Sequence, residues 1–583
     1  MDNTSELTPE IKSGVAELRQ QFSPLLLTEV ATRKKERISF DVILPDDYLG
    51  ISRILHIGFP EDYPLVTPVI SVSPNPWLEW PHVMDNGICL FSAGNSAVYG
   101  DGREVLSDTI NRVKKLIHFV SPSTPADERK AEFEREILSY WVRQLSVSSR
   151  KLLLLNTPSV SSPLFALTPA KNQQREQAPG VWLSDSPEVI IDYCNKNGTS
   201  VRKQINLIQA AFYVKLRTIP DVRIPAADNF IDWLKDHILP QEKELLQKWS
   251  DKHTGLPCRW VIADIPGPGP KTLYAFQLER KSVRSGAEII YGLRAGKKNI
   301  TPATVSREDK VLTSESYLID NSSIFSRTRD LDLGRLAGQK VLLIGAGSLG
   351  SQVAMQLVHS GVTHLTILDP DTLSDTNLGR HVLSCDYLGC NKALGMRDHL
   401  EKCIPTARVK AIPSYFHRAI IDKKIKLLDF NCIISTSADW GAEYHLWLFK
   451  SESTRFSVIQ GWTEPFALVG HALGCPASVK GDARHLFDRN GAFLKRFSEW
   501  PNNGVVNIPA CGAGFIAGNA VNIQTIAAMI THMALSYMQQ EDKNSREWHS
   551  FITESDSIKK NGGTYHGPAL SENTLNQVIK NEW

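Results

Sequence analysis

The stretch KVLLIGAGSLGSQVAMQLVHSGVTHLTILDPD, residues 340–371, decides the fold of the C-terminal half of the chain. Its apolar run VLLI is typical of a buried strand, the glycines predict a tight turn, and SQVAMQLV has helical periodicity. The run THLTIL predicts a second strand. Further strands at RVKAIPS, CIISTSA and FSVIQGW, separated by helix-like segments, predict a mostly parallel sheet with helices on both faces.

The turn between the first strand and the helix carries the spacing G-x-G-x-x-G. Gly345, Gly347 and Gly350 allow the backbone to approach a phosphate closely, and the following helix N-terminus offers free amides to it. Asp369 ends the next strand, where a carboxylate can accept hydrogen bonds from ribose hydroxyls. Taken alone, this constellation favours a nicotinamide dehydrogenase, and a plain glycine turn without a ligand is the other explanation.

A series of polar residues continues this pattern. It consists of Asp369, Asp371, Asn377, Arg380, Lys392 and Asp439. In this order the residues resemble the adenylating domain of the ubiquitin-activating superfamily, which includes the bacterial ThiF and MoeB proteins. The resemblance covers roughly Ser326 to the C-terminus and implies activation of a carboxylate by attack on the α-phosphate of ATP.

The same resemblance implies roles for these residues. Asp369 would hold the ribose, Asn377 would bind phosphate or ribose, and Arg380 and Lys392 would gather around phosphate oxygens. Asp439 would place magnesium, a hard cation that prefers oxygen ligands. An arginine upstream of the glycine strand, Arg329 or Arg327, would reach into the partner's site in a homodimer. Two positions depart from the family pattern, Ser435, where many relatives carry an acid, and His381, where a glutamine is common.

Cys511 precedes a long uncharged stretch that predicts a buried helix. A thiol at a helix N-terminus has a lowered pKa, and the position resembles the cysteine that accepts the acyl group in activating enzymes. A packed, inert cysteine is the other explanation for Cys511, and Cys475 is the rival nucleophile. Cys385, Cys390, Cys403 and Cys432 lie in or beside predicted elements and are expected in the core.

The N-terminal segment predicts an α+β domain with an antiparallel meander. Strands are expected at ISFDVILP, RILHIGFP and PVISVSP, and helices over residues 108–119 and 127–144. Residues 8–145 resemble a ubiquitin-conjugating domain, with a Tyr63-Pro64 pair and Gly-Ile-Cys89-Leu on a loop. The resemblance implies that Cys89 is the acceptor nucleophile, although a small apolar filler is the alternative. The usual His-Pro-Asn is absent, and Asn86 or backbone amides are the candidates for the oxyanion donor.

The rest of the chain is less informative. Residues 146–179, rich in Ser, Pro and Gln, predict a linker, although the apolar run Leu152–Leu155 could dock elsewhere. Residues 180–320 predict a mixed supporting domain without a chemical motif, which could be an inactive adenylating-like domain. The division expected is therefore 1–145, 146–179, 180–320 and 321–583, in an overall α/β chain.

Composition excludes several classes of protein. Lys+Arg number 65 and Asp+Glu 63, so the net charge is +2. The sequence therefore lacks the excess of positive charge that is typical of nucleic-acid-binding proteins. Pro509, asparagines and His532 argue against a membrane span in the uncharged C-terminal stretch. Nine cysteines without a C-x-x-C pair indicate the cytoplasm and no structural zinc.

Together the two halves resemble the fused conjugation enzymes of cyclic-oligonucleotide antiphage (CBASS) operons. The resemblance implies a relay from ATP to Cys511 to Cys89 and then to lysines of target proteins. It also implies the C-terminus of a cGAS-like (DncV-like) nucleotidyltransferase as the carboxylate, and a homodimer. A noncatalytic interaction scaffold and an NAD-dependent oxidoreductase are the alternatives.

Overall fold

The computed structural model divides the chain into two compact units. One comprises Met1–Leu153, Thr157–Ser186 and Leu207–Tyr317, and the other Leu154–Asn156, Pro187–Asn206 and Leu318–Trp583. The structure describes residues 7–85, 87–90, 100–168, 179–197, 207–267, 269, 271–284, 289–291, 298–300, 305–328, 330–507, 514–540, 543–553, 555–570 and 576–583.

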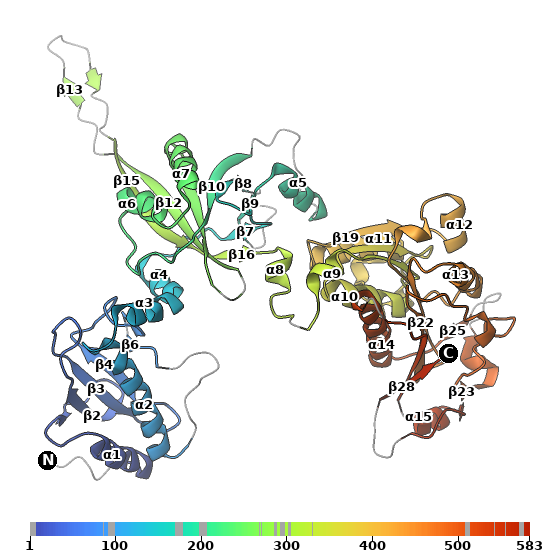
Figure 1. The fold of residues 1–583 in the computed structure, drawn as a ribbon, viewed down its shortest axis with the longest axis horizontal. Coiled ribbons are helices and arrows are strands. Elements are labelled where there is room, and N and C mark those ends of the chain that lie inside the picture. The colour runs from blue at the N-terminus through green and yellow to red at the C-terminus, as the bar shows by residue number, and fades with distance from the viewer. Residues whose placement is uncertain are drawn as a thin grey trace. The chain divides into compact units, whose positions relative to one another are not determined.

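The N-terminal part is the predicted α+β arrangement (Figure 1). Its four-stranded sheet has the order β1-β2-β3-β4, and every neighbouring pair is antiparallel, as the alternating sequence pattern predicts. Helices α1 and α2 contribute Leu18, Ile110 and Val113 to the same apolar core as Phe40 and Ile57 of the sheet. The elements are α1 (Pro9–Gln21), β1 (Leu27–Val30), β2 (Glu36–Ile43), β3 (Ile54–Pro60), β4 (Val69–Ser73), β5 (Val83–Met84), β6 (Gly87–Ile88) and α2 (Gly102–Val120).

The helix predicted over residues 127–144 is two helices, α3 (Ala126–Arg135) and α4 (Ile137–Gln144). Glu136 separates them because its backbone leaves the helical region, with φ −121° and ψ 19°. The turn lets Trp141, which is fully buried, pack against Tyr274 and Phe276 of the middle sheet, with ring centroids 5.4 and 5.5 Å away.

The middle of the chain forms an eight-stranded sheet in the order β15-β12-β11-β10-β8-β9-β7-β16. Strands β10 and β11 run parallel, whereas the pairs β8–β10, β8–β9, β11–β12 and β12–β15 are antiparallel. The elements are β7 (Leu152–Leu154), β8 (Ser162–Leu167), β9 (Val181–Ser184), α5 (Pro187–Lys196), β10 (Ile208–Lys215), α6 (Ala227–Lys235), α7 (Pro240–Lys252), β11 (Cys258–Ile265), β12 (Thr272–Arg284), β13 (Ile289–Tyr291), β14 (Lys298–Ile300), β15 (Val305–Ser314) and β16 (Ser316–Leu318).

Two strands of this sheet, β7 and β8, lie within residues 146–179. The prediction of a linker over these residues is therefore wrong. Leu152, Leu153 and Leu154 are buried, which explains the isolated apolar run in a stretch of otherwise polar composition. The polar composition of this stretch does not reveal the strands, because they are short and pair with segments distant in sequence.

The C-terminal sheet has the order β19-β18-β17-β20-β21-β22-β26-β28. From β19 to β21 all neighbouring strands are parallel, and β22, β26 and β28 extend the sheet in antiparallel fashion. This Rossmann-like arrangement confirms the predicted fold class. The larger elements are β17 (Lys340–Ile344), α10 (Ser348–His359), β18 (His364–Leu368), α11 (Lys392–Cys403), β19 (Arg408–Ile412), α12 (Phe416–Ile421), β20 (Cys432–Ser435), α13 (Trp440–Glu452), β21 (Ser457–Thr463), β22 (Val469–Cys475), α14 (Ala520–Gln539), β26 (Glu547–Ile552) and β28 (Gln577–Glu582). The shorter ones are α8 (Asn321–Ile324), α9 (Leu333–Ala337), β23 (Ser498–Glu499), β24 (Val505–Asn507), β25 (Gly514–Ile516), α15 (Ser555–Lys560) and β27 (Thr564–Tyr565).

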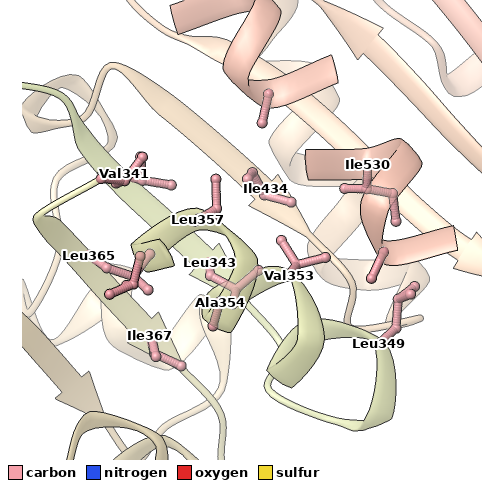
Figure 2. Close-up of a cluster of buried hydrophobic side chains, with 14 of the residues drawn as sticks. Val341, Leu343, Leu349, Val353, Ala354, Leu357, Leu365, Ile367, Ile434 and Ile530 are labelled. Atoms are coloured by element: carbon pink, nitrogen blue, oxygen red, sulfur yellow. The ribbon is translucent and has the colours of Figure 1, made fainter. Parts of the chain in front are cut away.

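Strand β17 divides its side chains between the two faces of this sheet. Val341 and Leu343 join a cluster with helices α10, α11 and α14, whereas Leu342 and Ile344 join a second cluster with α12 and α13. Figure 2 shows the first cluster, in which Val353, Leu357 and Ile530 surround the strand residues. Alternation along the strand therefore places helices on both faces and leaves the C-terminal edge of the parallel strands for a site.

Helix α14 supplies the buried, uncharged helix that the sequence predicts near the C-terminus. It begins at Ala520 with Asn519 as its N-cap, and strand β25 lies between it and Cys511. Its residues Ile526, Ile530 and Met533 are buried in the core. Among the described helices, none combines the length and the hydropathy that crossing a bilayer requires.

Candidate functional site

The glycine turn joins β17 to α10 at the carboxyl edge of the parallel strands. Gly345 has φ 89°, and a Cβ atom there would lie 2.8 Å from the Cα of Ser437. At Gly350 a Cβ would lie 2.0 Å from the carbonyl oxygen of Gly345. At Gly347, the N-cap of α10, nothing lies within 4 Å. The first and third glycines are thus required by packing, and the second leaves open space in front of the helix N-terminus.

Asp369 follows β18 and lies under this turn, only 4% exposed. Its Oδ2 accepts a hydrogen bond from the Ala346 amide at 2.6 Å, and its Oδ1 accepts one from the Asp371 amide at 2.8 Å. Burial raises the pKa of Asp369, against the opposing effect of these amides and of Lys392. Each carboxylate oxygen has a second lone pair, so the group can still accept a bond from a ligand hydroxyl.

Lys392 and Asp439 come from two other helices. Lys392 is the first residue of α11, is 8% exposed, and places its Nζ 3.1 Å from Oδ2 of Asp371. Asp439 is the N-cap of α13, and its Oδ1 accepts hydrogen bonds from the amides of Gly441 at 3.0 Å and Ala442 at 3.4 Å. The site therefore holds a cation partnered by a single carboxylate, next to a second, exposed carboxylate.

One pocket of about 220 Å³ collects most of the predicted nucleotide residues. Its polar wall comes from the turn and the following loops, and Leu368, Phe416 and Ala442 supply apolar surface. The predicted residues that line it are Gly345, Gly347, Asp369, Asp371, Lys392 and Asp439. Motifs separated by nearly one hundred positions in the sequence thus meet at one edge of the sheet.

Among the described residues, the predicted Gly350, Asn377 and Arg380 do not line this pocket. Asn377 accepts bonds from the amide and hydroxyl of Ser374 at 3.0 and 3.1 Å and so caps its own turn. Arg380 donates to the carbonyl of Ile516 at 3.3 Å. Arg329 lies outside the described residues, whereas Arg327, the other candidate for the arginine that reaches into a dimer partner, is described and exposed.

His381 is a residue whose contribution sequence reasoning missed. Its Nδ1 lies 3.0 Å from the Leu383 amide, which must donate, so Nε2 carries the proton and donates to the carbonyl of Ala346 at 2.7 Å. Burial lowers the pKa of His381, which agrees with a neutral ring. The imidazole thereby fixes the middle of the glycine turn. Its position directly after Arg380 in the motif is the signal that pointed to it.

The proposed acyl-accepting Cys511 lies outside the described residues. Its rival Cys475 is fully buried on β22, and burial raises the pKa of its thiol. A Cβ added to Gly481 would lie 2.6 Å from its sulfur, so protein atoms cover the thiol closely. Such a thiol is a poor nucleophile, which disfavours Cys475.

The other cysteines of this half differ from the expectation that all lie in the core. Cys432 is buried on β20, and burial raises the pKa of its thiol to about 12. Cys385, Cys390 and Cys403 are exposed instead. The sequence placed them beside predicted elements, but each occupies a turn or a helix end, where side chains face solvent.

Cys89 follows the two-stranded β5–β6 hairpin and is exposed. Its amide donates to the carbonyl of His82 at 2.7 Å, and the His82 amide donates to the hydroxyl of Tyr140 at 2.7 Å. The hairpin is therefore tied to helix α4. Asn86, considered as an oxyanion donor, lies outside the described residues.

The ring of His82 bridges two acids. Its Nε2 lies 3.0 Å from Oε1 of Glu132, and its Nδ1 lies 2.9 Å from Oε2 of Glu136. Burial favours the neutral ring, but the two carboxylates outweigh it and raise the pKa of His82. With both nitrogens facing carboxylates, the His82 ring anchors the loop before Cys89 to α3 and to Glu136 at the start of α4.

Residues 320–448 match the model of the ThiF family. An ATP-dependent ubiquitin transferase-like protein Cap2 from Enterobacter hormaechei subsp. hoffmannii is 36% identical over 138 residues, which are 23% of this chain and 23% of that protein. A molybdopterin-synthase adenylyltransferase from Haemophilus influenzae is 36% identical over 103 residues, 17% of this chain and 42% of that protein. The crystal structure of E. coli MccB with MccA covers 43% of this chain and 65% of its own, with 14% identity and a TM-score of 0.31.

The similarity thus spans 23% and 42% of the lengths of these two curated relatives. The family model includes the glycine turn, Asp369, Lys392 and Asp439, the residues that line the pocket. The match to the ThiF family model thus spans residues 320–448, the segment of this chain that contains these pocket residues.

Proposed function

We propose that this chain activates the C-terminal carboxylate of a protein with ATP and transfers the acyl group through Cys511 and Cys89 to amines of target proteins. The observation that carries the proposal is the pocket at the edge of the parallel sheet. It joins a glycine turn and helix N-terminus, a buried ribose-type acid in Asp369 and a cation in Lys392.

The first step is adenylation. A carboxylate oxygen of the substrate attacks the α-phosphorus of ATP, a new oxygen–phosphorus bond forms, and the bond to pyrophosphate breaks. Negative charge spreads over phosphate oxygens in the transition state, so preorganised amides and an ammonium group stabilise it. Gly347 leaves the amides at the start of α10 open toward the pocket, and Lys392 can exchange its partner Asp371 for phosphate.

Magnesium fits this site as a companion of the nucleotide. Asp371 and Asp439 are exposed carboxylates on the pocket wall. Among the described residues, no group of three or more His, Cys, Asp or Glu side chains is placed to hold a metal ion by itself. Mg²⁺ commonly binds through one or two carboxylates and substrate phosphates, and when bound it would neutralise phosphate charge.

The later steps are two thiol transfers and one aminolysis. The thiolate of Cys511 attacks the acyl carbon, forming a carbon–sulfur bond and releasing AMP. The thiolate of Cys89 then attacks the same acyl carbon and releases the Cys511 thiolate. An amine finally displaces the Cys89 thiolate and loses a proton as the amide forms. The exposure of Cys89 and the anchoring of its loop through His82 support this role.

The partners belong to the same proposal. The carboxylate is that of a cGAS-like (DncV-like) nucleotidyltransferase C-terminus, the acceptors are lysines, and a homodimer brings Arg329 to the partner's pocket. The similar Cap2 protein is a ubiquitin transferase-like protein, which supports a conjugation reaction of this class. Thiol intermediates and ATP fit a reducing compartment such as the cytoplasm.

Pyrophosphate exchange into ATP tests the adenylation step. With magnesium and a peptide that ends in the partner's C-terminal sequence, we expect exchange that Lys392→Ala reduces by about 10²-fold. Lys402→Ala is the matched control, because Lys402 is an exposed lysine on the same helix. An oxidoreductase would bind NAD and show no exchange, and such a result would refute the proposal.

Intact mass spectrometry tests the relay. Cys89→Ala should accumulate an acyl adduct on Cys511, whereas Cys511→Ala should form no adduct on Cys89. An adduct on Cys89 in the Cys511→Ala variant would show that the order is wrong. Unmodified protein after incubation with ATP and partner would favour the noncatalytic scaffold instead.

A further inference from the structure

Glu443 is a buried acid directly behind the nucleotide pocket. It lies in the first turn of α13, where its amide donates to the carbonyl of Asp439 at 3.0 Å. The residue is 5% exposed and does not line the pocket. Burying a carboxylate is costly unless donors surround it, so its retention needs a structural or functional reason.

Donors from two different elements surround this carboxylate. Oε1 accepts from the hydroxyls of Ser435 at 3.1 Å and Ser437 at 3.5 Å. Oε2 accepts from the side-chain amide of Gln460 at 2.7 Å, and the indole of Trp447 donates to the other end of that amide at 2.6 Å. Glu443 therefore connects strand β21 to the loop that follows β20.

The loop that Glu443 holds, residues 435–439, carries Asp439 into the pocket. Its Ala438 has φ 53°, a left-handed conformation that is unfavourable for a residue with a Cβ and that the surroundings must maintain. The hydroxyl of Thr436 donates to the carbonyl of Gly345 at 3.0 Å. The backbone of Ser437 packs against Gly345 so closely that a Cβ on the glycine would overlap it.

We propose that Glu443 is a positioning residue of the nucleotide site, holding the 435–439 loop in the conformation that aligns Asp439 with the glycine turn. The inference rests on the proposed function, because it assumes that the pocket binds ATP. The acid does not touch the nucleotide. It acts through Ser435 and Ser437 on a strained loop, and through that loop on Gly345.

The environment of Glu443 agrees with such a role. Burial raises the pKa of Glu443 to about 7, although the serine hydroxyls and the Ala438 amide oppose the shift. A neutral glutamine keeps an acceptor and is nearly isosteric, so it retains most of the contacts. Alanine removes them all and leaves Gln460 and both serines without their shared acceptor.

The test measures binding of Mg·ATP by the full chain, using calorimetry at neutral pH. We expect Glu443→Ala to weaken the affinity by about tenfold or more, and Glu443→Gln to recover most of it. Glu452→Gln, an exposed acid at the end of the same helix, is the control and should bind like the original chain. In pyrophosphate exchange, the KM for ATP should rise while kcat changes little.

The outcomes separate this inference from the proposed function. If the unsubstituted chain and the Glu452→Gln control do not bind ATP, the proposed function fails. If both bind and Glu443→Ala binds equally well, only the positioning role is overturned. Should Glu443→Ala fail to fold, Ser437→Ala removes one contact from the loop side, and an unchanged affinity for ATP in that variant would overturn the role.

Discussion

Glu464 is another buried acid of the C-terminal half, and its contacts lead to a prediction about pH. Its Oε1 accepts from His471 Nε2 and from the Phe497 amide, each at 2.7 Å, and Ser498 donates to Oε2. Burial would raise the pKa of Glu464, but these donors outweigh it and lower the pKa below 4.5. Its contribution to stability is therefore present above pH 4.5 and is lost as the pH falls further.

Glu464→Gln should accordingly lower the apparent melting temperature at pH 7, since it removes the charge that His471 and Ser498 face. The expected cost is about 1–3 kcal/mol. The difference from the original chain should begin to shrink as the pH falls below 4.5, because the unfolded carboxylate then gains a proton while the native one stays ionised to lower pH. Thermal unfolding followed by circular dichroism from pH 4 to pH 8 measures it, with Glu452→Gln as control. A constant difference across that range would contradict the assignment.

At the scale of residues, sequence reasoning identified the groups whose chemistry is tied to a motif. Asp369, Lys392 and Asp439 lie together on one pocket wall, and their roles toward a nucleotide stay a prediction. The contributions of Glu443 and His381 were not predicted. They depend on hydrogen bonds to Gln460 and Ala346, which belong to other elements. A motif specifies what can touch a ligand, whereas the residues that orient it depend on packing that spacing alone does not reveal.

The turn between β17 and α10 forms part of the pocket wall, and two of its glycines offer a matched pair of variants. Gly350→Ala would place a Cβ 2.0 Å from the Gly345 carbonyl and 2.6 Å from the Thr436 hydroxyl. Backbone atoms cannot yield cheaply, so we expect a loss of about 3 kcal/mol or more. Gly347→Ala meets nothing within 4 Å and has φ −72°, so it should fold normally. Equal melting temperatures for the two variants would refute this packing argument.

Elements with strong periodicity were predictable, and short paired strands were not. The strand–turn–helix–strand unit of residues 340–368 appears as expected because apolar period and glycine spacing agree. Strand β7 lies in the predicted linker, where it is placed between strands β9 and β16 and its three leucines are buried. The apolar run of Leu152–Leu155 indicates burial, but the sequence does not show which distant strands this segment pairs with.

The whole molecule consists of two compact units, and only one contains the glycine turn. Because units with separate cores unfold separately unless a large interface couples them, we expect calorimetry to resolve at least two transitions. Gly350→Ala identifies the transition of the unit that holds the pocket, since it should lower that one alone. The alternatives of adenylation and hydride transfer can then be separated without measuring turnover.

Mg·ATP at about one hundred times its dissociation constant should stabilise the pocket-containing unit by about 2.7 kcal/mol, because a ligand that binds only the folded state shifts unfolding by mass action. The corresponding transition should rise by about 5–10 °C while the other stays in place. NAD at the same concentration should shift neither transition, because the proposed reaction uses ATP and not a dinucleotide. Lys392→Ala should reduce the ATP shift and Lys402→Ala should preserve it. A shift with NAD alone would favour the oxidoreductase.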